Sequence, residues 1–177
     1  MPDYRRNRIP GGTYFFTVCL ADRSSNLLTT HIASLRAAVR KARAQRPFHI
    51  DAWVILPDHM HCLWTLPDSD SDFPGRWREI KKAFSKQLPP VECRSDVMAS
   101  RGERGIWQRR YWEHTIRDDR DYTAHMDYTH FNPVKHGFVA QVADWPFSTF
   151  RHCVRLGLYP CAWQGDGDDV PEAGERR

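Results

Sequence analysis

The stretch FHIDAWVILPDHMHCLWTL, residues 48–66, decides the fold class of this protein. Its first half places apolar side chains at every second position, which predicts a β-strand. Pro57-Asp58 is a turn signal, and the apolar run HMHCLWTL, residues 59–66, follows it as a second strand. Two strands separated by so short a connection are expected to pair as an antiparallel hairpin. The alternating apolar residues of the first strand are Phe48, Ile50, Ala52, Val54 and Leu56.

Upstream of this hairpin, the sequence predicts one strand and one helix. The run TYFFTVCL, residues 13–20, is rich in β-branched and aromatic residues and follows two glycines, which is typical of a buried strand. Apolar residues then recur at helical spacing until Pro47 ends the pattern. The residues of this apolar stripe are Ile32, Leu35, Val39 and Ala42.

Downstream of the hairpin, a helix entered at Pro74 is followed by a fourth strand. Apolar residues at helical spacing predict the helix, and the run IWQRRYWEHTI, residues 106–116, predicts the strand. Residues 89–105 between them show no periodicity, so we expect a flexible insertion there. The apolar residues of the helix are Trp77, Ile80, Phe84 and Leu88.

The last part of the chain predicts two further helices. Asp118 or Asp119 caps the first of them, and we expect this helix to end near Asn132 because Pro133 disfavours helical geometry in the residue before it. The stretch WPFSTFRHCVRLGLYP, residues 145–160, predicts a short helix with flanking turns.

The predicted elements follow the order β-α-β-β-α-β-α, and the first six match the split βαβ, ferredoxin-like arrangement. We therefore expect an α+β fold, in which one antiparallel sheet has helices on one face and a C-terminal helical extension. The other face or an edge of the sheet is then available for a ligand. Residues 1–164 are expected to form one domain, and the acidic residues 165–177 a disordered tail.

Composition excludes several classes of protein. A hydrophobic share of 41% in 177 residues suffices for a core, which argues against disorder. The chain has neither an apolar run of membrane-spanning length nor a signal peptide, so we expect a cytoplasmic protein with no membrane partner. The five cysteines include no C-x-x-C pair, which argues against a disulfide framework or a four-thiolate zinc site.

Charge is distributed unevenly along the chain. Residues 165–177 contain five acidic residues and two arginines, whereas residues 1–164 contain 24 Lys and Arg against 17 Asp and Glu, a net charge of +7. A basic body with 12% aromatic residues is typical of a nucleic-acid-binding protein. A solvated surface rich in arginine is the alternative interpretation.

Two sets of residues are candidates for chemistry. His59 and His61 lie two positions apart on a predicted strand, so they project from one face and can bind a metal ion together. Tyr128 and Asn132 lie four positions apart on a predicted helix and share a face. Tyr122 lies about 120° away around that helix and cannot face the same ion. A hydrogen-bonded histidine pair and a packing tyrosine are the structural alternatives.

Together these two sets resemble the REP-associated tyrosine transposases, a branch of the single-tyrosine HUH nucleases. The family signatures appear in order and the resemblance runs from about residue 4 to residue 163. The matching stretches are GGTYFFTV (11–18), AWVILPDHMHCLWTLP (52–67), RRYWEHTIRDDRDY (109–122), DYTHFNPVKHGFV (127–139) and DWPFSTF (144–150).

The resemblance implies a ferredoxin-like fold and cleavage of single-stranded DNA at hairpins of repetitive extragenic palindromes. It implies that Tyr128 is the nucleophile and forms a 5′-phosphotyrosine, and that His59 and His61 bind a divalent Mg²⁺ or Mn²⁺ ion. Asn132 falls where the family places a third ligand. Glu113 or His114 is the alternative third ligand, and only one of these two neighbours on a strand can face the site. We expect no small-molecule substrate.

Basic residues indicate where DNA binds. We expect an N-terminal arm to reach the foot of a hairpin, and a basic helix and an arginine pair to hold its backbone. These residues are Arg5, Arg6 and Arg8 in the arm, Arg78, Lys81, Lys82 and Lys86 in the helix, and Arg109 and Arg110 in the pair.

Two other functions stay open at this point. The chain could be a nucleic-acid-binding module of the same fold without turnover. It could also be a zinc hydrolase that uses His59, His61 and a third histidine. No long apolar stripe is left over for a dimer interface, so we expect a monomer.

Overall fold

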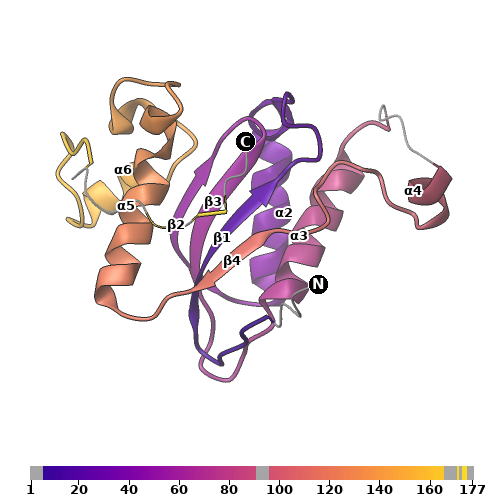
Figure 1. Ribbon diagram of the computed structural model, residues 1–177, viewed down its shortest axis with the longest axis horizontal. Coiled ribbons are helices and arrows are strands. Elements are labelled where there is room, and N and C mark those ends of the chain that lie inside the picture. The colour runs from indigo at the N-terminus through magenta and orange to yellow at the C-terminus, as the bar shows by residue number, and fades with distance from the viewer. Residues whose placement is uncertain (1–5, 91–95, 166–170, 172, 175–177) are drawn as a thin grey trace.

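The computed structural model describes residues 6–90, 96–165, 171, 173 and 174. Its centre is a four-stranded antiparallel sheet with the order β2-β3-β1-β4 (Figure 1). This order, with two helical crossovers, is the predicted ferredoxin-like arrangement, so the α+β fold class is confirmed. The strands are β1 (Thr13–Cys19), β2 (His49–Ile55), β3 (His59–Thr65) and β4 (Trp112–Thr115).

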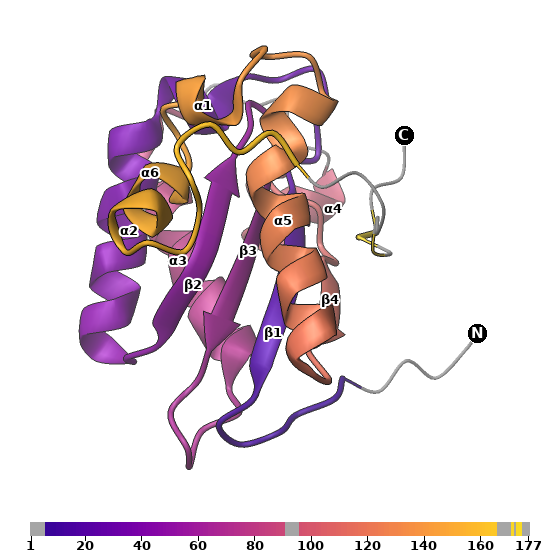
Figure 2. The same cartoon turned by 90° about the vertical axis from the view of Figure 1, so that its left-hand side faces the viewer.

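Helices cover both faces of the sheet. The crossover helices α2 (Ile32–Gln45) and α3 (Phe73–Gln87) lie together on one face, as predicted. The long helix α5 (Asp119–Lys135) lies on the opposite face, against β2 and β3 (Figures 1 and 2). The sequence left either this face or an edge of the sheet available for a ligand, and in the structure α5 crosses this face. Shorter helices are α1 (Leu27–Thr30), α4 (Asp96–Ser100), the 3-10 helix η1 (Val142–Asp144) and α6 (Phe150–Arg155).

The alternation predicted for the first strand of the hairpin breaks within β2. Ile50 pairs with Trp64 but Ala52 pairs with the next residue, Leu63, so a β-bulge lies between them. The bulge shifts the register by one residue. Ile50 therefore packs against the α2/α3 core, whereas Ala52 packs on the α5 side.

Two predicted boundaries differ from the structure. The fourth strand is much shorter than residues 106–116, although Trp107 forms an isolated bridge with Leu20. Helix α5 does not end near Asn132 but continues through Pro133 to Lys135. A proline this close to a helix end removes only one hydrogen bond, and the backbone N–H of His136 still reaches the Asn132 carbonyl at 3.0 Å.

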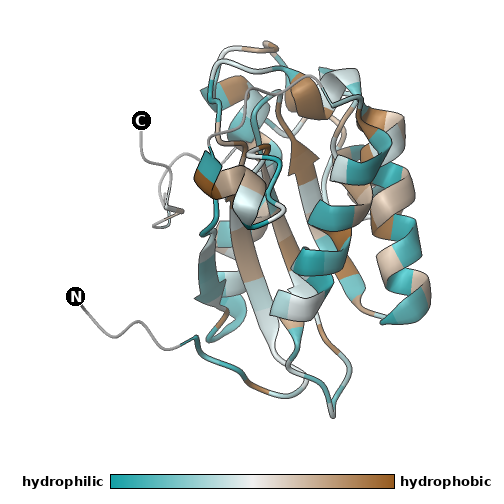
Figure 3. Ribbon diagram, turned by 90° about the vertical axis from the view of Figure 1, so that its right-hand side faces the viewer, coloured by the Kyte–Doolittle hydropathy of each residue, from teal (hydrophilic) through white to brown (hydrophobic). Residues whose placement is uncertain are grey.

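The main core lies between the sheet and the pair α2/α3. Hydrophilic and hydrophobic residues are mixed along both helices (Figure 3), as expected for helices that bury one side and expose the other. Trp64 of β3 stacks on Trp77 of α3 with ring centroids 4.3 Å apart. Asp72 caps α3 by accepting a hydrogen bond from the Gly75 N–H. Arg76 of α3 is buried, and its guanidinium donates to backbone carbonyls and to Asp70, so it serves the fold.

The two segments that were predicted to be flexible or disordered, residues 89–105 and 165–177, lie partly outside the described residues. Residues 91–95 of the segment 89–105 are outside them, and the described part contains helix α4. Of the tail, 165–177, only Gly165, Pro171, Ala173 and Gly174 are described. In the described part of the chain, no helix is both long enough and apolar enough to cross a membrane.

Candidate functional site

His61 lies on the face of β3 that meets α5 and is fully buried. The register places it opposite Thr17 of β1, and its Nδ1 lies 2.8 Å from the Thr17 hydroxyl oxygen. That hydroxyl donates its own hydrogen to the Ala173 carbonyl at 2.6 Å, so it accepts from His61. The proton of His61 is therefore assigned to Nδ1, and Nε2 keeps the lone pair that a metal ion needs.

His59 is held in the same way by a different partner. Its Nδ1 donates to the Asp58 carboxylate at 2.8 Å, which again assigns the lone pair to Nε2. Although burial alone raises the pKa of the Asp58 carboxyl, the hydrogen bonds from His59 and Arg23 and the positive charge of Arg23 hold that pKa below its usual value. Asp58 is therefore an anionic acceptor that fixes the orientation of the His59 ring.

The structure brings Tyr128 to this histidine pair. The rings of His59 and His61 lie 5.0 Å apart, and the Tyr128 ring lies 5.2 Å from His61 at a steep angle. Tyr128 is 7% exposed and also contacts Phe15 of β1. Two imidazoles and one phenol from separate parts of the sequence thus meet between β3 and α5.

Tyr122 points elsewhere, as the helix geometry predicts. Its hydroxyl donates to the Asp51 carboxylate at 2.9 Å, and burial, together with this carboxylate, raises its pKa well above the usual value. Tyr111 packs against the α2/α3 core and the guanidinium of Arg6. Tyr128 is therefore the tyrosine that the described structure places beside His61.

The end of α5 contributes residues that sequence reasoning missed. Asn132 is fully buried one turn after Tyr128, as expected from their spacing. Beyond it, the His136 ring lies 5.2 Å from His59, and the Lys135 ammonium donates to the Tyr128 hydroxyl at 2.8 Å. The helical spacing of Lys135 and His136 from Tyr128 points to both residues, but only in a helix that continues past Pro133.

The two alternative third ligands face opposite sides of the sheet. Glu113 pairs with Phe16, on the α2/α3 side, and its carboxylate lies 3.5 Å from Arg6. His114 pairs with Phe15, on the α5 side, but donates to Asp121 at 2.8 Å. The two residues therefore lie on opposite faces of the sheet, and Glu113 is turned away from His59 and His61.

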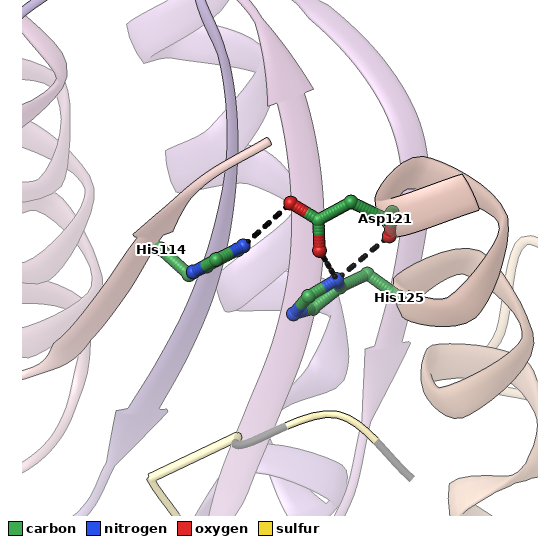
Figure 4. Close-up of side chains that lie close together, drawn as sticks. All are labelled: His114, Asp121 and His125. Atoms are coloured by element: carbon green, nitrogen blue, oxygen red, sulfur yellow. Dashed lines mark hydrogen bonds and ion pairs between the residues drawn. The ribbon is translucent and has the colours of Figure 1, made fainter. Parts of the chain in front are cut away.

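His114, Asp121 and His125 form a second cluster at the start of α5 (Figure 4). Their candidate ligand atoms lie within 4.8 Å of one another, and the two imidazole rings stack with centroids 4.6 Å apart. Burial alone raises the pKa of the Asp121 carboxyl, but hydrogen bonds from His114 and Arg117 lower it to about 2. The shared carboxylate holds the first turns of α5 against β4.

The candidate DNA-binding residues gather around the β4 edge and α3. Arg6 donates to the Tyr111 hydroxyl at 2.9 Å, and Lys81 lies 5.2 Å from the same ring. Burial lowers the pKa of Lys81 to about 8. Arg109 is paired with Glu103 at 3.0 Å. All the described candidates except Lys81 are exposed, namely Arg6, Arg8, Arg78, Lys82, Lys86, Arg109 and Arg110, and Arg5 lies outside the described residues.

These basic residues and the histidine pair do not share one surface. Helix α3 lies on the opposite face of the sheet from α5, and β4 forms the edge between them (Figure 1). A polyanion that contacts both α3 and the histidines therefore has to reach from one face of the sheet to the other, and the β4 edge lies beside Arg6.

The described part of the tail lies on the α5 face. Ala173 is buried among Phe15, Leu63 and Met126, and its carbonyl accepts the hydrogen bond from Thr17. Gly174 sits so close to Trp112 that a Cβ atom there would lie 2.4 Å from the indole ring. The tail therefore touches the residue that orients His61.

Comparisons with known proteins place the chain among named relatives. A REP-associated tyrosine transposase of Escherichia coli (strain K12) is 54% identical over 176 residues, which are 99% of this chain and 98% of that protein. A protein of Haemophilus influenzae is 45% identical over 170 residues, or 95% of this chain and 96% of that one. No protein-family model matches the chain.

One solved structure covers the whole chain. It is a REP-associated tyrosine transposase bound to a REP hairpin, with a TM-score of 0.85 and 54% sequence identity. The match extends over 100% of this chain and 99% of that chain.

Proposed function

The chain belongs to the REP-associated tyrosine transposase family, and from this we propose that it recognises REP-type DNA hairpins and cuts single-stranded DNA beside them. The relative of known structure is bound to a REP hairpin, which supports hairpin DNA as the partner. The observation that carries the proposal is the contact of Tyr128 with His61, whose Nδ1 is held by Thr17.

We propose that His59, His61 and Asn132 hold a divalent metal ion. Both imidazoles present Nε2 from oriented rings, and Asn132 offers an amide oxygen on the adjoining helix face. Such a mixed nitrogen and oxygen set fits Mn²⁺ and also accommodates Mg²⁺. His136, next to His59, is the second candidate for the third ligand. A bound ion would neutralise charge on the scissile phosphate.

The residues of the chain itself position and carry out the transfer. The Tyr128 oxygen attacks the phosphorus, the bond from phosphorus to the 3′ oxygen breaks, and the tyrosine proton ends on that oxygen. The products are a 5′-phosphotyrosine and a free 3′-hydroxyl, and attack by another 3′-hydroxyl reverses the step. The number and kind of bonds are conserved, so no nucleotide cofactor or redox partner is needed.

For DNA binding we propose that the strand runs over the β4 edge. Arg6 of the N-terminal arm contacts Tyr111 and Glu113 at this edge, and Arg8, the pair Arg109-Arg110 and the basic residues of α3 supply further positive charge. Arg5 belongs to the same arm in sequence and is proposed to contact the strand as well. Phosphate contacts of this kind fix position without reading sequence. We also propose that residues 1–164 act as one domain and as a monomer, which light scattering at several concentrations tests.

The proposal is tested with labelled hairpin DNA and Mn²⁺ on a denaturing gel. The parent protein should form a covalent adduct, and mass spectrometry should locate the nucleotide on Tyr128. Tyr128→Phe should lose the adduct completely, because the missing oxygen is the nucleophile, while melting temperature and hairpin affinity stay nearly unchanged. Tyr122→Phe is the matched control and should retain the adduct.

Other outcomes of this experiment identify the alternatives. Hairpin binding without cleavage would indicate a silent binding module. A free 5′-phosphate without an adduct would indicate a hydrolase, which the approach of His136 to His59 makes the second candidate. An adduct on Tyr122 or on a serine would refute the role of Tyr128.

A further inference from the structure

Lys135 reaches the same oxygen that the proposed reaction uses. Its ammonium nitrogen lies 2.8 Å from the Tyr128 hydroxyl oxygen and 4.6 Å from the centroid of the tyrosine ring. His61 contacts the same ring with centroids 5.2 Å apart. We propose that Lys135 is a catalytic residue, which stabilises the negative charge on the Tyr128 oxygen during strand cleavage and rejoining.

The contact depends on α5 continuing past its proline. Residues seven apart in an α-helix lie about 20° from each other around the axis and two turns apart along it. A lysine side chain is long enough to span two turns, and helical side chains lean toward the N-terminus. Lys135 therefore extends back over the turn of Asn132 to Tyr128. A helix that ended at Asn132 would not bring Lys135 onto this face.

The chemistry calls for a cation at this point. During rejoining, a 3′-hydroxyl attacks the phosphotyrosine, the bond from phosphorus to the Tyr128 oxygen breaks, and negative charge develops on that oxygen. A donor that is already in place when the charge develops lowers the barrier. Cleavage passes through the same transition state in the opposite direction, so Lys135 accelerates both steps. This inference rests on Tyr128 being the nucleophile.

A lysine that only held a DNA phosphate would behave differently. Loss of a phosphate contact weakens binding at all sequences and reduces its salt dependence. Loss of a cation at the reacting oxygen lowers the rate with saturating DNA and leaves the affinity almost unchanged. A small amine that diffuses into the vacated space should then restore part of the rate.

The experiment measures single-turnover adduct formation with saturating hairpin DNA and Mn²⁺ for the parent, Lys135→Met, Lys135→Arg and Lys135→Ala. Lys135→Met should slow the step by about 10²–10³-fold, the usual loss for one such donor, with hairpin affinity within a few-fold. Lys135→Arg should retain part of the rate, and ethylamine should accelerate Lys135→Ala. Lys41→Met, an exposed lysine of α2, is the control and should match the parent.

The outcomes separate this inference from the proposed function. If the parent forms the Tyr128 adduct and Lys135→Met forms it equally fast, Lys135 has no catalytic role and the proposed function stands. A rate that recovers fully when more DNA is added also overturns the inference, since it indicates a binding contact. If the parent forms no adduct on Tyr128, the proposed function fails and this inference fails with it.

Discussion

On the face of β3 that meets α2 and α3, Met60, Cys62 and Trp64 pack into an aromatic core. His59 and His61 alternate with Met60 and Cys62 along the strand, so they lie on the face that meets α5, where both are buried. Both faces are buried, so the difference is not exposure but the kind of group that is buried. The α5 side also holds most of the other buried polar residues, namely Thr17, His125, Thr129, His130 and Asn132.

This contrast shows a division of roles between the two faces of the sheet. Buried polar groups contribute less to stability than apolar ones, because each must recover in the protein the hydrogen bonds it had in water. His61, His59 and His125 recover theirs through Thr17, Asp58 and Asp121. The α2/α3 face therefore supplies most of the stability, and the α5 face supplies oriented side chains.

The strongest test of this division compares neighbouring residues of β3. His61→Ala should abolish adduct formation and leave most hairpin affinity, since cationic side chains supply it. Trp64→Ala should lower the free energy of unfolding by about 3–5 kcal/mol, while the molecules that stay folded still cleave. Denaturant unfolding and the adduct gel measure the two effects. Asn132→Ala should be milder than His61→Ala, because water can replace an amide oxygen.

The division breaks down if His61→Ala cuts at the parent rate with trace metals chelated. It also breaks down if Trp64→Ala is as stable as the parent, because the aromatic core on the α2/α3 face would then not be the main source of stability.

A smaller effect is expected when only the orientation of His61 is disturbed. Thr17→Val keeps the shape of the side chain but removes the hydroxyl that accepts from His61 Nδ1. Loss of such a partner typically costs about 10–100-fold in metal affinity or activity. Titration with Mn²⁺ and the cleavage rate measure it. Thr13→Val, on the same strand but bonded to Thr65, is the control and should leave both values unchanged.

The network at the start of α5 should make stability depend on pH. The pKa of Asp121, lowered to about 2, lies below its unfolded value of about 3.9, so its contribution is complete above pH 4 and is lost as pH falls through 2. Asp121→Asn should cost roughly 1–3 kcal/mol at neutral pH, and this difference should shrink between pH 4 and pH 2. Urea unfolding at each pH measures it.

Asp119→Asn is the matched control, an exposed carboxylate in the same helical turn. It should change stability much less than Asp121→Asn at neutral pH. Equal losses in the two variants would mean that the hydrogen bonds of Asp121 do not carry the effect.

The smallest effect is expected from the acidic tail. It is joined to a basic body, and its described residue Ala173 touches Thr17 on the α5 face. Deletion of residues 165–177 should tighten hairpin binding a few-fold at low salt, where charge repulsion is least screened. Hairpin affinity measured across a salt series tests this. An affinity that does not change at any salt concentration would count against competition by the tail.

Much of the fold could be predicted because its signals are local. The β-branched and aromatic run of β1, the apolar run of β3, the helical spacing of Trp77, Ile80 and Phe84, and the short Pro57-Asp58 connection each specify an element. Prediction failed where backbone geometry departed from a regular period. The bulge after Ile50 and the passage of α5 through Pro133 are such places.

The candidate site divides in the same way. Sequence spacing alone placed His59 with His61 and Tyr128 with Asn132, because each pair lies within one element of fixed period. It could not show that the two pairs meet, since nothing local states which face of the sheet α5 will cover.

The sequence by itself determined the main helices and strands, their order, and the residues that share a face within each of them. Only the tertiary structure decided that Thr17, on another strand, orients His61, that Glu113 faces away while His114 faces α5, and that Lys135 reaches Tyr128. The physical reason is that short-range periodicity comes from backbone geometry, whereas these contacts depend on strand register and on where a helix ends. Both are settled by packing of the whole chain.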